Sequence, residues 1–507
     1  MADLLFFGGY LCNAKDADPK SFILDMYEKY GHNFADHIYG MFSIGIYDEN
    51  EEELILVRDR FGSKSLYYYI TEGGELLYSQ SIKEILVKPG FKKEFNHDAL
   101  ELYLSFSYMP GEDTFFKGLK KLRPGHMLIW HKKKIDIIKY WEAIPQPDES
   151  LTLEECADMI HKAAMEAAPD WKINAGETGN FLSGGVDSGY LTALMGSKTT
   201  FSAGYEDPEF DESVVAAETA KALNIGNTKV LIEPDLYFKS VPDVMYAMEE
   251  PIGDASCIVF YLAAKEAAKH VRVCYSGEGA DELFSGYHAY VRRFKQLKEA
   301  EENGVDPATL PQVEDFFIGN TKLFHEDEKK AILKEYKGKI LPLELARSLY
   351  SFDENTDDMT KILLCDLNVW FEGDIMLNAE KMSEAAGLDA RTPFLDPRIV
   401  EAALKIPSKY RVNEVQTKLA FRKAAENLLP VEIAQRKKIG FPAPARTWIQ
   451  KEPYLSMIRD MFESETAEVF FNTEALTEML KEDLIADKWR YIWCIYVFLI
   501  WYRRFFE

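Results

Sequence analysis

The sequence predicts an α/β protein in two parts: an antiparallel, β-rich part, followed by a parallel-sheet α/β part with a helical C-terminal region. Three observations lead to this fold class. Residues 1–145 alternate aromatic and β-branched segments with turns, residues 178–277 alternate apolar segments with amphipathic ones, and the chain after about residue 290 is mainly helical in pattern. We therefore expect two domains, residues 1–145 and 146–507, joined by an acidic, proline-containing linker.

In the first part, three pairs of segments predict antiparallel hairpins. Segments 42–48 and 53–59 flank a polar turn, and segments 65–70 and 75–81 flank the glycine turn TEGG. A third pair lies within residues 122–141. All of them are rich in β-branched and aromatic residues, which favour strands.

In the second part, short apolar segments between amphipathic helices predict a parallel sheet with helices on both faces. The expected strands are 178–183, 199–205, 228–234 and 271–277. Near the C-terminus, the twelve apolar residues 491–502 are too few to span a bilayer. We expect this stretch to form a buried helix.

Composition narrows the class of protein. The net charge of −25 argues against a generic binder of nucleic acids or anionic membranes, although it does not exclude small anionic ligands. The six cysteines are scattered without a CxxC pair, which predicts buried, reduced thiols. No signal peptide is visible at the start. We expect a cytoplasmic protein that acts on small molecules and has no nucleic-acid or membrane partner.

Two glycine-rich loops follow predicted strands. Residues 183–188 read SGGVDS, and residues 276–281 read SGEGAD. Ligands of a parallel sheet bind outside the carboxyl ends of its strands, where both loops would lie. Glycine loops that lead into helix N-termini suit phosphate groups, but neither loop fits the Walker pattern or the dinucleotide-binding pattern.

The acidic residues in these loops indicate a cation. Asp187 and Asp281 would repel phosphate directly, and Mg²⁺ can bridge carboxylates to phosphate oxygens. The alternative for Asp187 is that it caps the following helix. Because two such loops occur at strand ends, the sequence favours a Mg²⁺–nucleotide site.

These loops resemble those of a known family. LSGGVDS is similar to the pyrophosphate-binding loop of ATP pyrophosphatases, which split ATP into AMP and pyrophosphate, and SGEGADELFSGY narrows the resemblance to the asparagine synthetase family. Stretches such as RDRFGSKSLYYY, GLDARTPFLDPRIVEAALKIP and RKKIGFPAP extend it over nearly the whole chain. The resemblance implies an N-terminal domain derived from an Ntn-type glutaminase and a C-terminal ATP pyrophosphatase domain.

The resemblance also implies roles for individual residues. Those expected to hold ATP are Leu182, Ser183, Gly184, Gly185, Asp187, Ser188, Ser276 and Gly277. Asp187 and Asp281 would bind Mg²⁺. Glu278 and Lys438 would be catalytic, the lysine by stabilising charge on the adenylate and on the leaving pyrophosphate.

Several of these assignments have alternatives. Glu278 could be a solvated loop carboxylate, and Lys437 competes with Lys438. Arg391 and Lys418 are weaker candidates, and Arg391 could instead be buried and paired.

The N-terminal domain departs from the family pattern. Glutamine-dependent members carry a cysteine directly after the initiator methionine, whereas this sequence has Ala2 and lacks an RHRGPD-like stretch. Gly8 and Tyr10 stand where the family has a polar pair that holds glutamine. We expect a truncated, inactive glutaminase-like domain in which Cys12 is a core residue, not a substitute nucleophile. Arg58 and Asp59 are expected to be scaffold residues.

The implied function is that of an asparagine synthetase-type ligase. The side-chain carboxylate of aspartate would react with ATP to give an acyl-adenylate and pyrophosphate, and ammonia would then give asparagine and AMP, with water excluded. Use of glutamine is doubtful, and a separate protein could supply the nitrogen.

Two alternatives to this function stay open. The same chemistry could act on another carboxylate, as in β-lactam synthetases or lasso-peptide cyclases, although β-lactam synthetases carry a tyrosine at the position of Glu278. The other alternative is a non-catalytic regulatory homologue. A homodimer is compatible with each of these functions.

Overall fold

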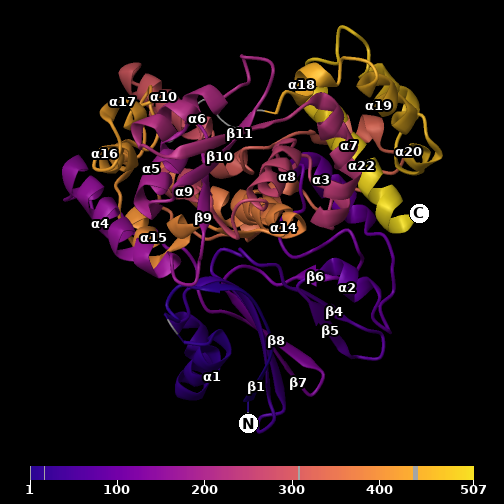
Figure 1. The fold of residues 1–507 in the computed structure, drawn as a ribbon. Helices are drawn as coiled ribbons and strands as arrows, with labels where there is room; N and C mark the ends of the chain where they lie inside the picture. Colours follow the sequence, from indigo (N-terminus) through magenta and orange to yellow (C-terminus); the bar gives the residue numbers. More distant parts are fainter. Residues whose placement is uncertain (1, 16, 307–308, 438–442) are drawn as a thin grey trace.

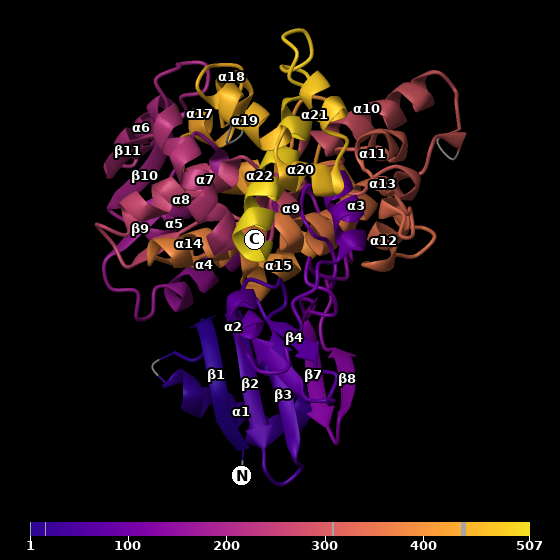
Figure 2. The same ribbon diagram turned by 90° about the vertical axis from the view of Figure 1, so that its right-hand side faces the viewer.

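A computed structural model describes residues 2–15, 17–306, 309–437 and 443–507. The predicted fold class is confirmed: an antiparallel β-rich part lies at one end of the molecule, and an α/β part with many helices lies at the other (Figures 1 and 2). Both views show the N-terminal strands projecting from the larger helical body.

The N-terminal part contains two antiparallel sheets, and all three predicted hairpins are present. The five-stranded sheet has the order β1 (Ala2–Leu11), β2 (Gly40–Asp48), β3 (Glu53–Arg58), β7 (His126–His131) and β8 (Lys134–Lys139). The three-stranded sheet has the order β5 (Leu76–Ser79), β4 (Tyr67–Ile70) and β6 (Lys120–Lys121).

Strand β1 was not predicted, because two glycines interrupt its apolar pattern. Gly8 lies against a side chain, and Gly9, with a φ of +115°, is required by a close approach to backbone. A Cβ on Gly8 would lie 1.9 Å from Nε2 of Gln80, and a Cβ on Gly9 would lie 1.9 Å from the carbonyl oxygen of Met41. The glycines in β1 are therefore explained by packing against neighbouring residues and not by strand propensity.

The large N-terminal sheet is buried on both faces. Ile55 and Val57 belong to a core shared with helix α1 (Pro19–Tyr30). Leu54 and Leu56 point to the opposite face and belong to a second core, shared with β4. This alternation follows the two-residue period of a strand.

The C-terminal part is built on a parallel sheet of five strands. Their order is β11 (Gly226–Leu231), β10 (Thr199–Gly204), β9 (Thr178–Phe181), β12 (Val273–Tyr275) and β13 (Asp389–Arg391). The four predicted strands are confirmed, and only β13 was missed. The chain runs outward from β9 to β11 and then returns to β12 on the other side of β9. A reversal of this kind opens a crevice at the carboxyl ends of β9 and β12, the strands between which it occurs.

Helices lie on both sides of this sheet, with α5 on one side and α8 on the other (Figure 1). The helices around the sheet are α4 (Leu153–Trp171), α5 (Val186–Met195), α6 (Ser213–Ala222), α7 (Pro234–Met248), α8 (Ser256–Ala267) and α9 (Ala280–Phe284). The described chain after residue 287 is mainly helical, as predicted.

The C-terminal helices complete the core of this part. They are α10 (His288–Glu302), α11 (Glu326–Ile332), α12 (Pro342–Ser348), α13 (Asp358–Cys365), α14 (Leu377–Ala386), α15 (Pro397–Leu404), α16 (Leu419–Ala425), α17 (Val431–Ala434), α18 (Ala445–Trp448), α19 (Tyr454–Phe462), α20 (Glu465–Phe470), α21 (Thr473–Glu478) and α22 (Trp489–Phe506). The predicted buried C-terminal helix is α22. None of the helices in the described ranges combines the length and apolar character that a membrane crossing requires.

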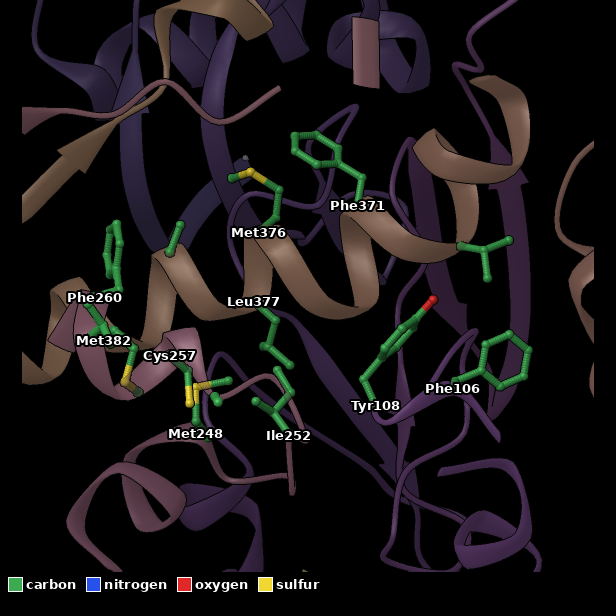
Figure 3. Packing of buried hydrophobic residues seen from close by; sticks show 14 of the residues in the cluster. Phe106, Tyr108, Met248, Ile252, Cys257, Phe260, Phe371, Met376, Leu377 and Met382 are labelled. Carbon is green, nitrogen blue, oxygen red and sulfur yellow. The ribbon is translucent and has the colours of Figure 1, made fainter. Parts of the chain in front are cut away.

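One continuous helical run passes through the centre of the core. It consists of α13, a π-helical segment η4 (Asp366–Met376) and α14. Figure 3 shows Met376 and Leu377 on this run, with Tyr108 lying against it. The contact needs a glycine, because a Cβ on Gly373 would lie 2.5 Å from Cδ2 of Tyr108.

Segments from the first 145 residues are built into the second part. Both views place helix α3 (His97–Phe106) among the C-terminal helices. Within α3, the Tyr103 hydroxyl donates a hydrogen bond to the carbonyl oxygen of Cys494 at 2.8 Å. Contacts of this kind join residues on the two sides of residue 145. The domain boundary expected there stays a prediction.

A buried ion pair also joins the two parts. Arg58 Nη1 lies 2.7 Å from Glu372 Oε1, and both side chains are almost fully buried. The neighbouring Asp59 accepts hydrogen bonds from four backbone amides, those of Phe42, Phe61, Ser63 and Lys64. This is the scaffold arrangement that was expected for Arg58 and Asp59.

Removing one partner of this ion pair should destabilise the whole fold. Glu372→Gln leaves the Arg58 guanidinium buried without its counter-ion, so the free energy of unfolding should fall by about 3 kcal/mol or more. Urea denaturation followed by circular dichroism measures this change. The matched control is Glu384→Gln, which removes the half-exposed partner of Lys64 and should cost at most about 1 kcal/mol. Equal losses in the two variants would contradict the account.

Candidate active site

The loops after β9 and β12 meet at one edge of the parallel sheet and line a cavity of about 400 Å³. Most of the residues predicted for the site line it: Leu182, Ser183, Gly185, Asp187, Ser188, Ser276, Gly277, Glu278 and Asp281. Gly184 is not among them. It packs against Val215, whose Cγ1 would lie 2.9 Å from a Cβ at this position. Lys438 falls outside the described residues.

The first loop forms a small cradle of polar groups. The amide of Gly185 donates to Ser183 Oγ at 3.2 Å, and the amide of Ser183 donates to Ser188 Oγ at 3.1 Å. Helix α5 begins directly after Gly185, which is its N-cap residue, so the helix N-terminus lies at the cavity wall. Amides and a positive dipole end at this place suit an anion. The alternative of Asp187 as N-cap is wrong, because the cap falls two residues earlier.

A buried lysine lies between the two acidic residues of the loops. Lys418 Nζ donates to Asp187 Oδ2 at 2.6 Å and lies 2.7 Å from Asp281 Oδ1, and the side chain is 1 % exposed. The structure therefore places an ammonium group where the sequence predicted a metal cation. Lys418 was only a weak candidate, and no local spacing in the sequence pointed to this position.

The backbone of Lys418 is itself unusual. Its φ of +60° lies in the left-handed region, at the residue before α16. A non-glycine residue in a sparsely populated conformation costs about 1–3 kcal/mol and persists when its surroundings hold it. Here the two carboxylates supply that constraint. Arg422, one turn later, adds a second buried cation to the cavity wall.

A glycine makes this close arrangement possible. A Cβ on Gly286 would lie 1.7 Å from Asp281 Oδ1 and 2.2 Å from Lys418 Cε. Behind it, Glu282 is buried beside Asp281, and burial together with that neighbouring charge raises the pKa of Glu282 to about 7. The carboxylates gathered here make cations favourable on this side of the cavity.

The donor atoms fit a Mg²⁺ ion that is shared with phosphate. Asp187 Oδ1 is buried and has no hydrogen-bond partner among the described residues, so an oxygen ligand remains beside Lys418. Among the described residues, no group of three or more acidic, histidine or cysteine side chains is arranged to hold a metal. Two carboxylates are the number Mg²⁺ commonly uses when phosphates and waters complete its shell.

Other parts of the cavity wall were not predicted as site residues. Asn378 Oδ1 is buried and lacks a hydrogen-bond partner in the described chain. Asp254 accepts hydrogen bonds from the amide and the hydroxyl of Ser256. The stretch EEPIGDAS (residues 249–256), which contains Asp254, also resembles the asparagine synthetase family and could have pointed to this residue. No stretch of the sequence pointed to Asn378.

The cavity also has an apolar wall beside its polar loops. Phe181, Phe201 and Phe260 line it, and they suit the flat face of a nucleotide base. On the polar side, the Ser276 hydroxyl donates to Glu278 Oε1 at 3.0 Å. Glu278 is thus a held carboxylate at the cavity, not a freely solvated one.

Arg391 does not line the cavity. Its guanidinium donates to Asp389 Oδ2 and to the carbonyl oxygens of Trp171 and Ile173. The alternative of a buried, paired arginine is therefore confirmed. Lys437 is exposed and also lies away from the cavity lining.

Comparisons with known proteins identify the family. Residues 173–503 match the asparagine synthase family, and residues 15–141 match a glutamine amidotransferase domain. The fold and site thus define an ATP-dependent carbon–nitrogen ligase that acts on small molecules. The chain belongs to the asparagine synthase family, and its ligase activity is of the asparagine synthetase type.

Individual relatives agree with this assignment. The chain is 32% identical to asparagine synthetase [glutamine-hydrolyzing] 1 of Bacillus subtilis, over 97% of this chain and 82% of the relative. It is 26% identical to asparagine synthetase [glutamine-hydrolyzing] 3 of the same organism, over 83% and 70%. The solved NMN synthetase of Francisella tularensis aligns with 27% of this chain and 58% of its own, at 16% identity and a TM-score of 0.20, which is too low to bear on function.

Adding a methyl group at Gly286 should disable the site. In Gly286→Ala the new Cβ forces Asp281 and Lys418 apart, so ATP with Mg²⁺ should raise the melting temperature of the variant far less than that of the wild type. Differential scanning fluorimetry measures both shifts. The control is Gly73→Ala, where the Cβ meets only Thr71 Oγ1 at 3.7 Å. A full ligand-induced shift in Gly286→Ala would show that this close packing is not needed.

Proposed function

We propose that this enzyme activates the side-chain carboxylate of aspartate as an acyl-adenylate and transfers ammonia to it, which forms asparagine, AMP and pyrophosphate. The observation that carries this proposal is the convergence of Lys418 on Asp187 and Asp281. The same cavity is lined by the phosphate-type loop and by Glu278.

In this proposal the two loops hold the phosphates of ATP. The Ser183 and Ser188 hydroxyls and the first amides of α5 provide hydrogen-bond donors, and Asp187 and Asp281 hold Mg²⁺. When bound, Mg²⁺ neutralises charge on the phosphate oxygens. Lys418 adds positive charge beside the leaving pyrophosphate, where negative charge develops.

Glu278 is proposed to act in the second half of the reaction. Attack by ammonia leaves a positively charged nitrogen that must lose a proton, and a carboxylate within the cavity can accept it. The Ser276 hydroxyl holds Glu278 in place for this role. The phenylalanine wall limits access of water, which would otherwise hydrolyse the adenylate. The catalytic role of Lys438 stays a prediction.

Free ammonia is the proposed nitrogen donor. All six cysteines are buried and unpaired by disulfides, as predicted. Burial and the nearby Asp396 raise the pKa of the Cys12 thiol well above its usual value, so it does not form the thiolate that a nucleophile needs. Gly8 packs against Gln80, and the Tyr10 hydroxyl donates to the carbonyl oxygen of Asp170. None of these groups supports glutamine binding. The truncation of this domain and a homodimer stay predictions.

The decisive experiment supplies ATP, Mg²⁺ and aspartate, with ammonia or glutamine in parallel reactions. Asparagine, AMP and pyrophosphate should form with ammonia and not with glutamine. Asp187→Asn and Asp281→Asn should each lower pyrophosphate release by about a hundredfold or more, because each removes charge at the phosphate site.

The control for this assay is Cys12→Ala, which should keep the ammonia-dependent rate. Release of ADP, or pyrophosphate formation that does not depend on aspartate, would contradict the proposed reaction. Loss of the ammonia-dependent rate in a folded Cys12→Ala variant would contradict the scaffold role of Cys12.

A further inference from the structure

Two adjoining cavities lie at the junction of the N-terminal and C-terminal parts, away from the active site. One has a volume of about 130 Å³ and the other about 340 Å³. They share four lining residues: Arg60, Phe61, Trp141 and Glu142. None of the residues that line these two cavities lines the nucleotide cavity.

The smaller cavity holds two half-buried arginines. Arg60 and Arg123 both line it, and neither forms an ion pair with a carboxylate among the described residues. Arg60 Nε is buried without a hydrogen-bond partner, whereas Arg60 Nη2 donates to the carbonyl oxygen of Asp36 at 3.1 Å. Arg123 Nη2 donates to the carbonyl oxygen of Leu349 at 2.7 Å. Half-buried guanidinium groups with unused donors can bind an anion through charge-assisted hydrogen bonds.

The nearest ionisable groups do not supply that anion. Glu142 lines both cavities, but its carboxylate pairs with Lys139. His126 Nδ1 lies 2.7 Å from the carbonyl oxygen of Pro124, and burial lowers the pKa of its imidazole, so the ring is neutral at pH 7. The groups that line the smaller cavity therefore carry a net positive charge, although the charges of Glu372 and Glu112 outside the lining also act on Arg123.

The larger cavity is lined mainly by apolar side chains. Trp141 and Phe61 form one wall, and Ile144 and Leu404 also contribute. Ile144 is 57% exposed, so this cavity is reached from solvent. Its volume falls within the range of about 300–1,000 Å³ that small-molecule sites occupy, whereas the smaller cavity has room only for a head group.

We propose that the two cavities together bind a small organic anion. Its acid group, a carboxylate or a phosphate, lies in the smaller cavity against Arg60 and Arg123. Its aromatic or aliphatic body lies in the larger cavity against Trp141. This site is separate from the proposed reaction and does not depend on the identity of the substrate.

The proposed anion site and the nucleotide cavity are both lined by residues of the helical run that contains η4. Asn368, in η4, lines the smaller cavity, and Asn378, further along the same helical run, lines the nucleotide cavity. A ligand in the smaller cavity would touch both η4 and the loop after β3. It would therefore hold the two parts of the molecule together and raise the melting temperature.

Isothermal titration calorimetry with aromatic anions tests this proposal on the full chain. 1-Naphthoate and 1-naphthyl phosphate supply the two acid groups, and the one that binds more tightly identifies the preferred group. We expect saturable binding at one site per chain for at least one of them. The neutral isostere 1-naphthalenemethanol should bind at least about tenfold more weakly, because it cannot form charge-assisted hydrogen bonds.

Two variants locate the binding. Arg123→Gln removes one guanidinium, and Ser351→Glu adds a competing carboxylate at an exposed residue of the cavity wall; each should weaken binding at least about tenfold. Ser351→Glu keeps every native contact of the arginines, so it tests the proposal even if Arg123→Gln does not fold. The control Arg347→Gln alters an exposed arginine that pairs with Asp315 and should bind as the wild type does.

Three results would overturn the proposal. The first is no saturable binding of either anion. The second is equal affinity for the neutral isostere and the anions. The third is undiminished binding in folded Arg123→Gln and Ser351→Glu proteins.

Discussion

The ammonium group of Lys418, buried between Asp187 and Asp281, is the interaction on which the active site depends. Two carboxylates that face one cavity repel each other unless a cation lies between them. Lys418 supplies that cation in the protein alone and so keeps both loops in register with the crevice of the sheet. Mg²⁺ and phosphate can then enter a site whose two loops are already held in position. The Lys418 ion pairs therefore position the groups that would bind ATP and Mg²⁺, in addition to joining distant parts of the fold.

This interaction couples distant parts of the chain. Lys418 and Asp187 are 231 residues apart in sequence, and Lys418 reaches the cavity because α16 packs beside α4 and α5. The helical run through η4 adds Asn378 to the same cavity and carries Glu372, the partner of Arg58. The N-terminal part thus contacts the same element that forms one wall of the active site.

Local patterns in the sequence predicted most of the strands and the two glycine-rich loops, because each of these depends on residues that are close together in the chain. Glycine, serine and acidic residues after apolar strands placed Asp187 and Asp281 at one sheet edge. The role of Lys418 had no such signal, because its left-handed backbone and its burial follow from packing of remote segments. Strand β1 and Gly286 were missed for a related reason. Their glycines lie against Gln80, Met41 and Lys418, and such contacts exist only in the folded chain.

The most direct test of this account is Mn²⁺ binding, measured by electron paramagnetic resonance on the nucleotide-free protein. If Lys418 occupies the cation position, the wild type should bind Mn²⁺ weakly and Lys418→Met should bind it at least about tenfold more tightly, because a competing positive charge is gone. This gain should disappear when Asp187→Asn is combined with Lys418→Met. Equal Mn²⁺ affinity in the wild type and in a folded Lys418→Met variant would contradict the account.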